Sequence, residues 1–195
     1  PAFAGIPASR HEAACASGSI AALCAAAEIE AGRYELAAVV GIEQMRNVPG
    51  DQAAKNIGGS AMWNGHECQN VKYPWPHVFS LLGDEYARRY GLSHAHLMRI
   101  AEINFANAKR NPNAQTRGWS FTEASFSSDD AANPVIDGHI RKQDCGQVSD
   151  GAAVVFLASA QRAERYARER GLELADIPRL RGWGHRTAPI TYEAK

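Results

Sequence analysis

Residues 10–45 read RHEAACASGSIAALCAAAEIEAGRYELAAVVGIEQM and hold a cysteine, a helix-like run and a strand-like run in one stretch. The segment Ser19 to Ala31 is so rich in alanine, leucine and isoleucine that it has almost no polar face, which predicts a buried helix. Gly32 is the expected end of that helix. Glu35 to Ile42 is then nearly all apolar, with two central valines, which is typical of a strand buried on both faces.

Cys15 is the candidate nucleophile of this stretch. The expected order of elements places it at the N-terminus of the helix, where unpaired N–H groups and the helix dipole favour an anion such as a thiolate. Its small neighbours leave room for a substrate to reach the sulfur; they are Ala13, Ala14, Ala16 and Gly18. The residues alone also allow Cys15 to be an inert small hydrophobe, as we expect Cys24 to be.

Three separated motifs resemble the thiolase superfamily. They are HEAACASGS at residues 11–19 with AAVVGIEQM at 37–45, NPNAQTR at 111–117, and DCGQVSDGAAVVFLAS at 144–159. The Cys-x-Ser pattern of that superfamily matches Cys15 and Ser17. The second and third motifs resemble the sterol-carrier-protein type of thiolase more than the bacterial biosynthetic type, and the resemblance runs from about Ser9 to Trp183.

The resemblance implies an α/β, thiolase-like fold with two similar halves, a mixed sheet with central parallel strands, buried helices, and a helical and loop domain inserted in the first half. The expected parts are the nucleophile segment (1–46), the inserted loop domain (47–138), the end of the N-terminal half with a linker (139–176), and the start of the C-terminal half (177–195). Thiolases are much longer than this chain. We therefore expect an incomplete chain, with the remaining catalytic residues outside it.

The activity implied is that of an acyl-CoA C-acyltransferase. It cleaves a 3-ketoacyl-CoA by thiolysis, or condenses acetyl-CoA, through a covalent thioester on Cys15. Coenzyme A is then a substrate, no cofactor is permanently bound, and the protein is expected to be a homodimer or tetramer. Two alternatives stay open: a ketosynthase-like condensing enzyme, and a non-catalytic acyl-CoA-binding, lipid-binding or assembly subunit. The presence of Cys15, Ser17 and Gly18 counts against the second.

The amino-acid composition counts against several other classes of protein. Lys plus Arg and Asp plus Glu number 21 each, so no net field attracts nucleic acid or an anionic membrane. The 45% hydrophobic content is enough for a packed core, and no run resembles a membrane span. The four cysteines show no metal-binding or disulfide spacing, which favours a reducing, cytoplasmic location.

Within 47–138 the sequence predicts helices at Val78 to Tyr90 and His94 to Arg110, with Gly91 ending the first and Ser93 capping the second. The resemblance implies that this region covers coenzyme A. The cations Lys109, Arg110 and Arg117 are candidates for phosphate contacts, although a solvated helix end explains them better. The aromatic residues Trp63, Trp75, Phe79 and Trp119 are candidates for an acyl pocket or for local packing.

The remaining candidates receive structural interpretations. A metal site at His66, Glu67 and Cys68, or at His94 and His96, is disfavoured because consecutive side chains do not face one ion. Asp150 is expected to fix a turn, and Cys145 and His11 to be structural. We expect a second buried strand at Gly151 to Ala158 beside the first, a helix from Ser159 to Arg170 ended by Gly171, short extended structure at Val135 to Ile140, and a strand at Ile177 to Gly184.

Overall fold

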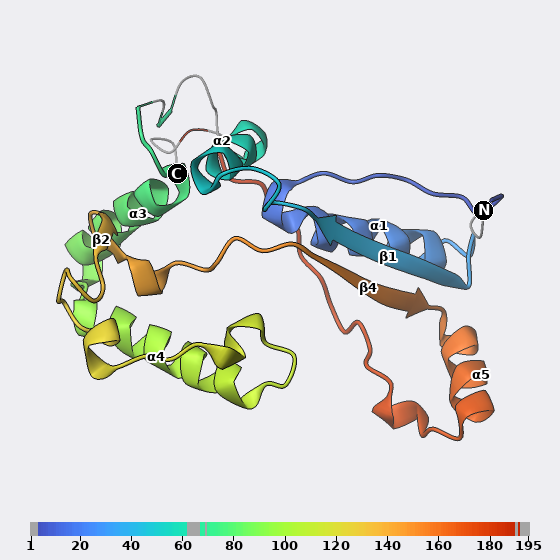
Figure 1. The fold of residues 1–195 in the computed structure, drawn as a ribbon. Helices are drawn as coiled ribbons and strands as arrows, with labels where there is room; N and C mark the ends of the chain where they lie inside the picture. Colours follow the sequence, from blue (N-terminus) through green and yellow to red (C-terminus); the bar gives the residue numbers. More distant parts are fainter. Residues whose placement is uncertain (1–3, 62–66, 69, 190, 192–195) are drawn as a thin grey trace. The chain divides into compact units, whose positions relative to one another are not determined.

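The structure, a computed structural model, describes residues 4–61, 67–68, 70–189 and 191. The chain divides into two compact units. The sheet unit consists of Pro1–Asn47, Ser60–Met62 and Ser149–Lys195, and the helical unit consists of Val48–Gly59 and Trp63–Val148. Figure 1 shows the elements of both units.

The sheet unit contains the strands β1 (Leu36–Glu43) and β4 (Gly151–Ala158). They pair antiparallel over their full lengths, from Leu36 opposite Ala158 to Glu43 opposite Gly151. The prediction that these two runs are neighbouring strands is confirmed. The prediction of central parallel strands is wrong for this pair, because an unbroken apolar run indicates burial and carries no information on strand direction.

The two faces of this sheet differ in exposure. Val39 is buried, with Ala37 and Leu157 half-buried on the same face, and the helix α1 (Ser17–Glu30) lies along both strands (Figure 1). The opposite face is apolar and exposed; it comprises Leu36, Val40, Ile42, Val154 and Phe156. The strands β1 and β4 are therefore not buried on both faces, because one helix covers one face of their sheet.

The helix α1 has no buried residue, and its Cys24 is exposed. The prediction of a buried helix is wrong for this chain. The surface of α1 is apolar on nearly all sides, so burying the helix would need neighbours on several sides. The two strands contact only one side of it. Its end is as expected: Gly32 has a φ of 72°, and the amides of Gly32 and Arg33 donate to the carbonyls of Ile29 and Glu28.

Asp150 directly precedes β4 and joins that strand to the segment that follows β1. Its Oδ1 accepts hydrogen bonds from the amides of Met45 and Arg46, both at 2.8 Å, just beyond the end of β1. The expected structural role is confirmed, although the bonds join two separate chain segments and not a single turn. The helix α5 (Ala160–Arg170) follows β4; Ser159 Oγ accepts from the Arg162 amide at 3.2 Å and Gly171 ends the helix with a φ of 64°.

The last described residues differ from expectation. After the short 3-10 helix η5 (Leu174–Asp176), residues 177–189 form no strand. The sequence IPRLRGWG at 177–184 was expected to be extended and hydrogen-bonded in a sheet. A strand exists only where a neighbour supplies its ladder of hydrogen bonds, and no strand in the described part of the chain pairs with this segment.

The helical unit contains residues 50–59 of α2 (Gly50–Ala61), together with α3 (Pro74–Tyr90) and α4 (His94–Arg110). The two helices predicted here are confirmed; α3 begins earlier, at Pro74, because proline is well suited to the first turn of a helix. Gly91 ends α3 with a φ of 73°, whereas Ser93 precedes α4 without a side-chain capping bond. That the unit is an insertion into a thiolase half stays a prediction.

The strands β2 (Val135–Asp137) and β3 (Ile140–Arg141) form a short hairpin that packs on α3. The short extended structure expected at Val135 to Ile140 is this hairpin. The buried Ser80 of α3 accepts a hydrogen bond from the His139 amide at 2.9 Å. Two His–Asp pairs join the same elements: His77 with Asp137 at 3.1 Å, and His139 with Asp84 at 2.9 Å. A second cluster, of aromatic rings, lies around α4 and comprises Phe105, Trp119, Phe121 and Phe126.

Candidate active site

Cys15 lies in a tight turn that leads directly into α1. The 3-10 helix η1 (Ala14–Ala16) contains it, and α1 begins at Ser17. The expected placement of Cys15 at a helix N-terminus is confirmed. The side chain is exposed, so a reagent can reach the sulfur, and the nearby end of the helix dipole favours a negative charge there.

The backbone beside Cys15 is strained. Ala14 has a φ of 49°, one of two positive values among the non-glycine residues that the structure describes. An L-residue in this left-handed region costs about 1 kcal/mol or more, and such residues cluster at functional sites. The strain turns the chain sharply just before the cysteine.

Ser17 and Glu12 hold this turn. The Ser17 hydroxyl accepts a hydrogen bond from the Ala13 amide at 2.8 Å and lies 2.6 Å from the Ala14 carbonyl oxygen, to which it donates. Glu12 Oε1 accepts from the Ala14 amide at 2.6 Å and lies 3.2 Å from the Ser17 hydroxyl. We call residues 12–17 the Cys15 turn; its polar side chains bind the backbone on both sides of Ala14.

The other three cysteines differ from Cys15 in place or in exposure. Cys24 is exposed on α1, away from the helix start. Burial raises the pKa of the half-buried Cys68 thiol, and the carboxylates of Glu67 and Asp137 raise it further. Burial, followed by the charge of Asp144, also raises the pKa of the half-buried Cys145, whose Sγ is 3.5 Å from the Arg141 carbonyl oxygen.

His11 lies close to the Cys15 turn in the sequence, and the disfavoured metal candidates lie further along the chain. His11 Nε2 lies 2.9 Å from Ser9 Oγ, which fits the structural role expected for it. His66 falls outside the described residues. Over the part of the chain that the structure describes, no three His, Cys, Asp or Glu side chains gather as a metal site would require.

The candidate phosphate-binding cations lie at the end of α4. Lys109 Nζ donates to the Trp119 carbonyl oxygen at 2.6 Å, and Arg110 donates to the Asn107 side chain. Arg117 lies in the 3-10 helix η2 (Gln115–Gly118) that follows. The bond of Lys109 joins the end of α4 to the residue after η2, and that of Arg110 stays within α4, which supports a structural role for both over phosphate binding.

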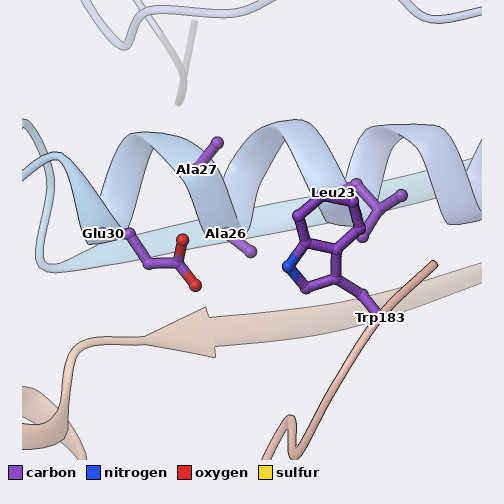
Figure 2. Close-up of a pocket in the computed structure, with 5 residues that line it drawn as sticks. All are labelled: Leu23, Ala26, Ala27, Glu30 and Trp183. Atoms are coloured by element: carbon purple, nitrogen blue, oxygen red, sulfur yellow. The ribbon is translucent and has the colours of Figure 1, made fainter. Parts of the chain in front are cut away.

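The aromatic candidates that the structure describes lie on two elements, with Trp75 and Phe79 on α3 and Trp119 beside α4. Trp119 belongs to the ring cluster around α4, with its centroid 6.4 Å from that of Phe105, so local packing explains it. Phe79 is exposed on α3, and Trp63 lies outside the described residues. A small apolar recess exists elsewhere, between α1 and the C-terminal segment, where Trp183 faces Leu23, Ala26, Ala27 and Glu30 (Figure 2). Cys15 does not line it.

Comparison with known proteins identifies the family. The model of the thiolase N-terminal domain matches residues 3–118. The chain belongs to the thiolase family. It is 30% identical over 161 residues to an acetyl-CoA acetyltransferase of Methanothermobacter thermautotrophicus, and 29% identical over 161 residues to an acetyl-CoA acetyltransferase of Methanocaldococcus jannaschii. Over 173 residues it is 27% identical to human sterol carrier protein 2.

The matches cover most of this chain and a minor part of each relative. Each alignment includes 83% of this chain, but 40%, 39% and 30% of the three relatives in the same order. The family membership expected from the three motifs is confirmed, and with it the thiolase-like α/β fold class. No described helix of this thiolase chain combines the length and the apolar character that crossing a bilayer requires.

Sequence reasoning found Cys15 and Ser17 but missed Glu12 and the left-handed backbone of Ala14. Glu12 carries a signal, because an acidic residue shortly before a tight turn can accept hydrogen bonds from the next backbone amides. The left-handed conformation of Ala14 carries none, since alanine rarely adopts it. The His–Asp pairs on α3 were also missed, because their partners are 60 and 55 residues apart in the sequence.

Proposed function

We propose that this thiolase chain supplies the nucleophile of an acyl-CoA C-acyltransferase and that Cys15 is the catalytic residue. The single observation that carries the proposal is the Cys15 turn: an exposed thiol on a strained backbone at the start of a helix. The archaeal relatives named acetyl-CoA acetyltransferase support the reaction class. The activity of the whole protein is part of this proposal.

The proposed reaction begins with attack of the Cys15 thiolate on the 3-keto carbon of a 3-ketoacyl-CoA. A tetrahedral oxyanion forms, and the Cys15 amide at the helix start is proposed as one of its hydrogen-bond donors. Such a donor typically contributes about 3 kcal/mol to transition-state stabilisation. The bond between carbons 2 and 3 then breaks, leaving the shortened acyl group on sulfur.

The electron pair of the broken bond passes to carbon 2, which takes a proton from a general acid, so that acetyl-CoA leaves. The thiol of a second coenzyme A gives its proton to a general base and attacks the acyl-cysteine. The acyl group transfers to coenzyme A, and Cys15 leaves as the thiolate. The reverse sequence condenses an acyl-CoA with acetyl-CoA, which for acetoacetyl-CoA means two acetyl-CoA molecules. Coenzyme A acts as substrate throughout, and no permanently bound cofactor is proposed.

The competing function is a thiolase-fold subunit that binds acyl-CoA or assembles with a partner and does no chemistry. A covalent trapping experiment separates the two. The protein expressed from its complete reading frame is incubated with acetyl-CoA, quenched in acid, digested and analysed by mass spectrometry. We expect one acetyl group on the peptide that contains Cys15 and none in Cys15→Ala. Binding without covalent transfer would reject the catalytic proposal.

A further inference from the structure

We propose that Glu12 is a positioning residue for Cys15: by accepting a hydrogen bond from the Ala14 amide, it holds Ala14 in its left-handed conformation and so keeps the sulfur at the start of α1. The inference rests on the proposed function of Cys15 and concerns a residue outside the Cys-x-Ser pair.

Glu12 and Ser17 bind the two peptide groups that flank the Cα of Ala14. Glu12 Oε1 accepts from the Ala14 N–H at 2.6 Å, and the Ser17 hydroxyl donates to the Ala14 carbonyl at 2.6 Å. A residue with a φ of 49° is held there only when its surroundings determine the conformation more strongly than its own preference. Here both polar groups of Ala14 are occupied by side chains, which fixes the two dihedrals that flank its Cα.

The Ser17 hydroxyl alone does not complete this arrangement. It has one proton, and that proton goes to the Ala14 carbonyl oxygen at 2.6 Å in preference to Glu12 Oε1 at 3.2 Å. Its lone pair accepts from the Ala13 amide at 2.8 Å. The Ala14 amide is therefore left to Glu12. Without that carboxylate, Ala14 is free to relax to negative φ, which swings Cys15 away from the helix start.

Glu12 acts through hydrogen bonding in this proposal and not as an acid or base. Its side chain is exposed and bonds to the backbone of the turn. A glutamine at this position keeps a side-chain carbonyl oxygen that can accept from the Ala14 amide, whereas alanine keeps no acceptor. A glycine at position 14 adopts positive φ without penalty and removes the need for the bond. These two substitutions give the proposal its test.

The test measures the rate of acetyl transfer from acetyl-CoA to Cys15 in a single turnover, using the protein expressed from its complete reading frame. We expect Glu12→Ala to slow the transfer about tenfold, the factor that corresponds to the loss of one charge-assisted hydrogen bond. Glu12→Gln is expected to stay within about threefold of the unsubstituted protein. The double variant with Glu12→Ala and Ala14→Gly is expected to match Ala14→Gly alone.

Glu28→Ala is the matched control, because it removes an exposed carboxylate from α1 that pairs with Arg33 and does not touch the Cys15 turn. It should leave the transfer rate unchanged. An unchanged rate in Glu12→Ala would overturn the proposal. So would a double variant as slow as Glu12→Ala, or a glutamine variant as slow as the alanine one, which would indicate that charge and not positioning is responsible.

Alkylation of the same variants with iodoacetamide distinguishes failure of this inference from failure of the proposed function. The reagent reports how well the helix start stabilises the Cys15 thiolate, whether or not the protein transfers acyl groups. No acetyl transfer in the unsubstituted protein would reject the proposed function. The order of the alkylation rates, with Glu12→Ala slowest and rescued by Ala14→Gly, would still support the positioning role, and equal rates would overturn it.

Discussion

Cys15 and Cys24 form a natural pair for comparison at the scale of single residues. Both thiols are exposed on the same stretch of chain, but only Cys15 lies at the start of α1. A difference in reactivity between them therefore reports the effect of the helix start and not of access. Cys68 and Cys145 complete the comparison, because both are half-buried with raised pKa.

We predict that iodoacetamide alkylates Cys15 first, followed by Cys24, and that Cys68 and Cys145 react last. Burial raises the pKa of the last two thiols, so less of each is ionised at a given pH, and their rates should still increase above the pH at which an ordinary thiol is fully ionised. Site-resolved mass spectrometry over a pH series provides the measurement. Equal rates for Cys15 and Cys24 would contradict the placement of Cys15.

At this scale the sequence predicted the cysteine but not what holds it. Cys15 is recognisable because a thiol among small residues, followed by Ser17 and an alanine-rich helix, is a local pattern. The support from Glu12 depends on the dihedral angles of Ala14, which side-chain identity does not specify. The ends of the helices were predictable, because residue type does indicate the backbone conformation of a glycine. Positive φ occurs at Gly32, Gly91 and Gly171, as glycine favours.

At the scale of elements, the hairpin on α3 depends on a close approach of backbone to side chain. Gly138 joins β2 to β3 with a φ of 43°, and a Cβ on it would overlap Ser80 Oγ. Ser80 is buried and its hydroxyl oxygen accepts from the His139 amide at 2.9 Å. A side chain at this position would therefore break the bond as well as strain the turn.

We predict that Gly138→Ala destabilises the helical unit by about 2 kcal/mol or more, combining the cost of positive φ with the steric overlap. Gly91→Ala is the matched control: Gly91 also has a positive φ, of 73°, but nothing lies within 4 Å of its added Cβ. It should cost about 1 kcal/mol. Urea unfolding measures both, and equal losses would show that the contact with Ser80 is unimportant.

The sequence predicted where the elements lie along the chain, but not how they pair or how exposed they are. Apolar runs located β1, β4 and α1, and turn residues located α3, α4 and α5. The antiparallel direction of β1 and β4 was not predictable, because direction depends on how the chain returns between them. The exposure of Phe156 and Ile42, at 68% and 77%, was not predictable either, because an apolar run indicates only that a partner surface is needed.

At the scale of the whole molecule, the exposed face of the β1–β4 sheet is the dominant feature. Its apolar side chains gather on one surface of the sheet unit; they are Leu36, Val40 and Ile42 on one strand and Val154 and Phe156 on the other. Contiguous apolar surface of this kind binds other apolar surfaces or dyes. The homodimer or tetramer expected from the family resemblance stays a proposal.

We predict that the 195-residue chain alone binds the dye ANS and self-associates. The double substitution Val40→Thr and Val154→Thr replaces two paired, exposed valines with a residue that is also well suited to strands, and should lower both effects. Dye fluorescence and light scattering measure the two. A monodisperse monomer without dye binding would contradict the prediction.

The central claim is that Cys15 is the nucleophile of an acyl-CoA acyltransferase, and acetoacetyl-CoA thiolysis by the protein expressed from its complete reading frame tests it most directly. We predict turnover that Cys15→Ala abolishes while folding is retained, because an exposed side chain in a turn contributes little packing. Cys24→Ala, which removes the other exposed thiol, should keep the rate of the unsubstituted protein. Turnover by Cys15→Ala at the rate of the unsubstituted protein would contradict the claim.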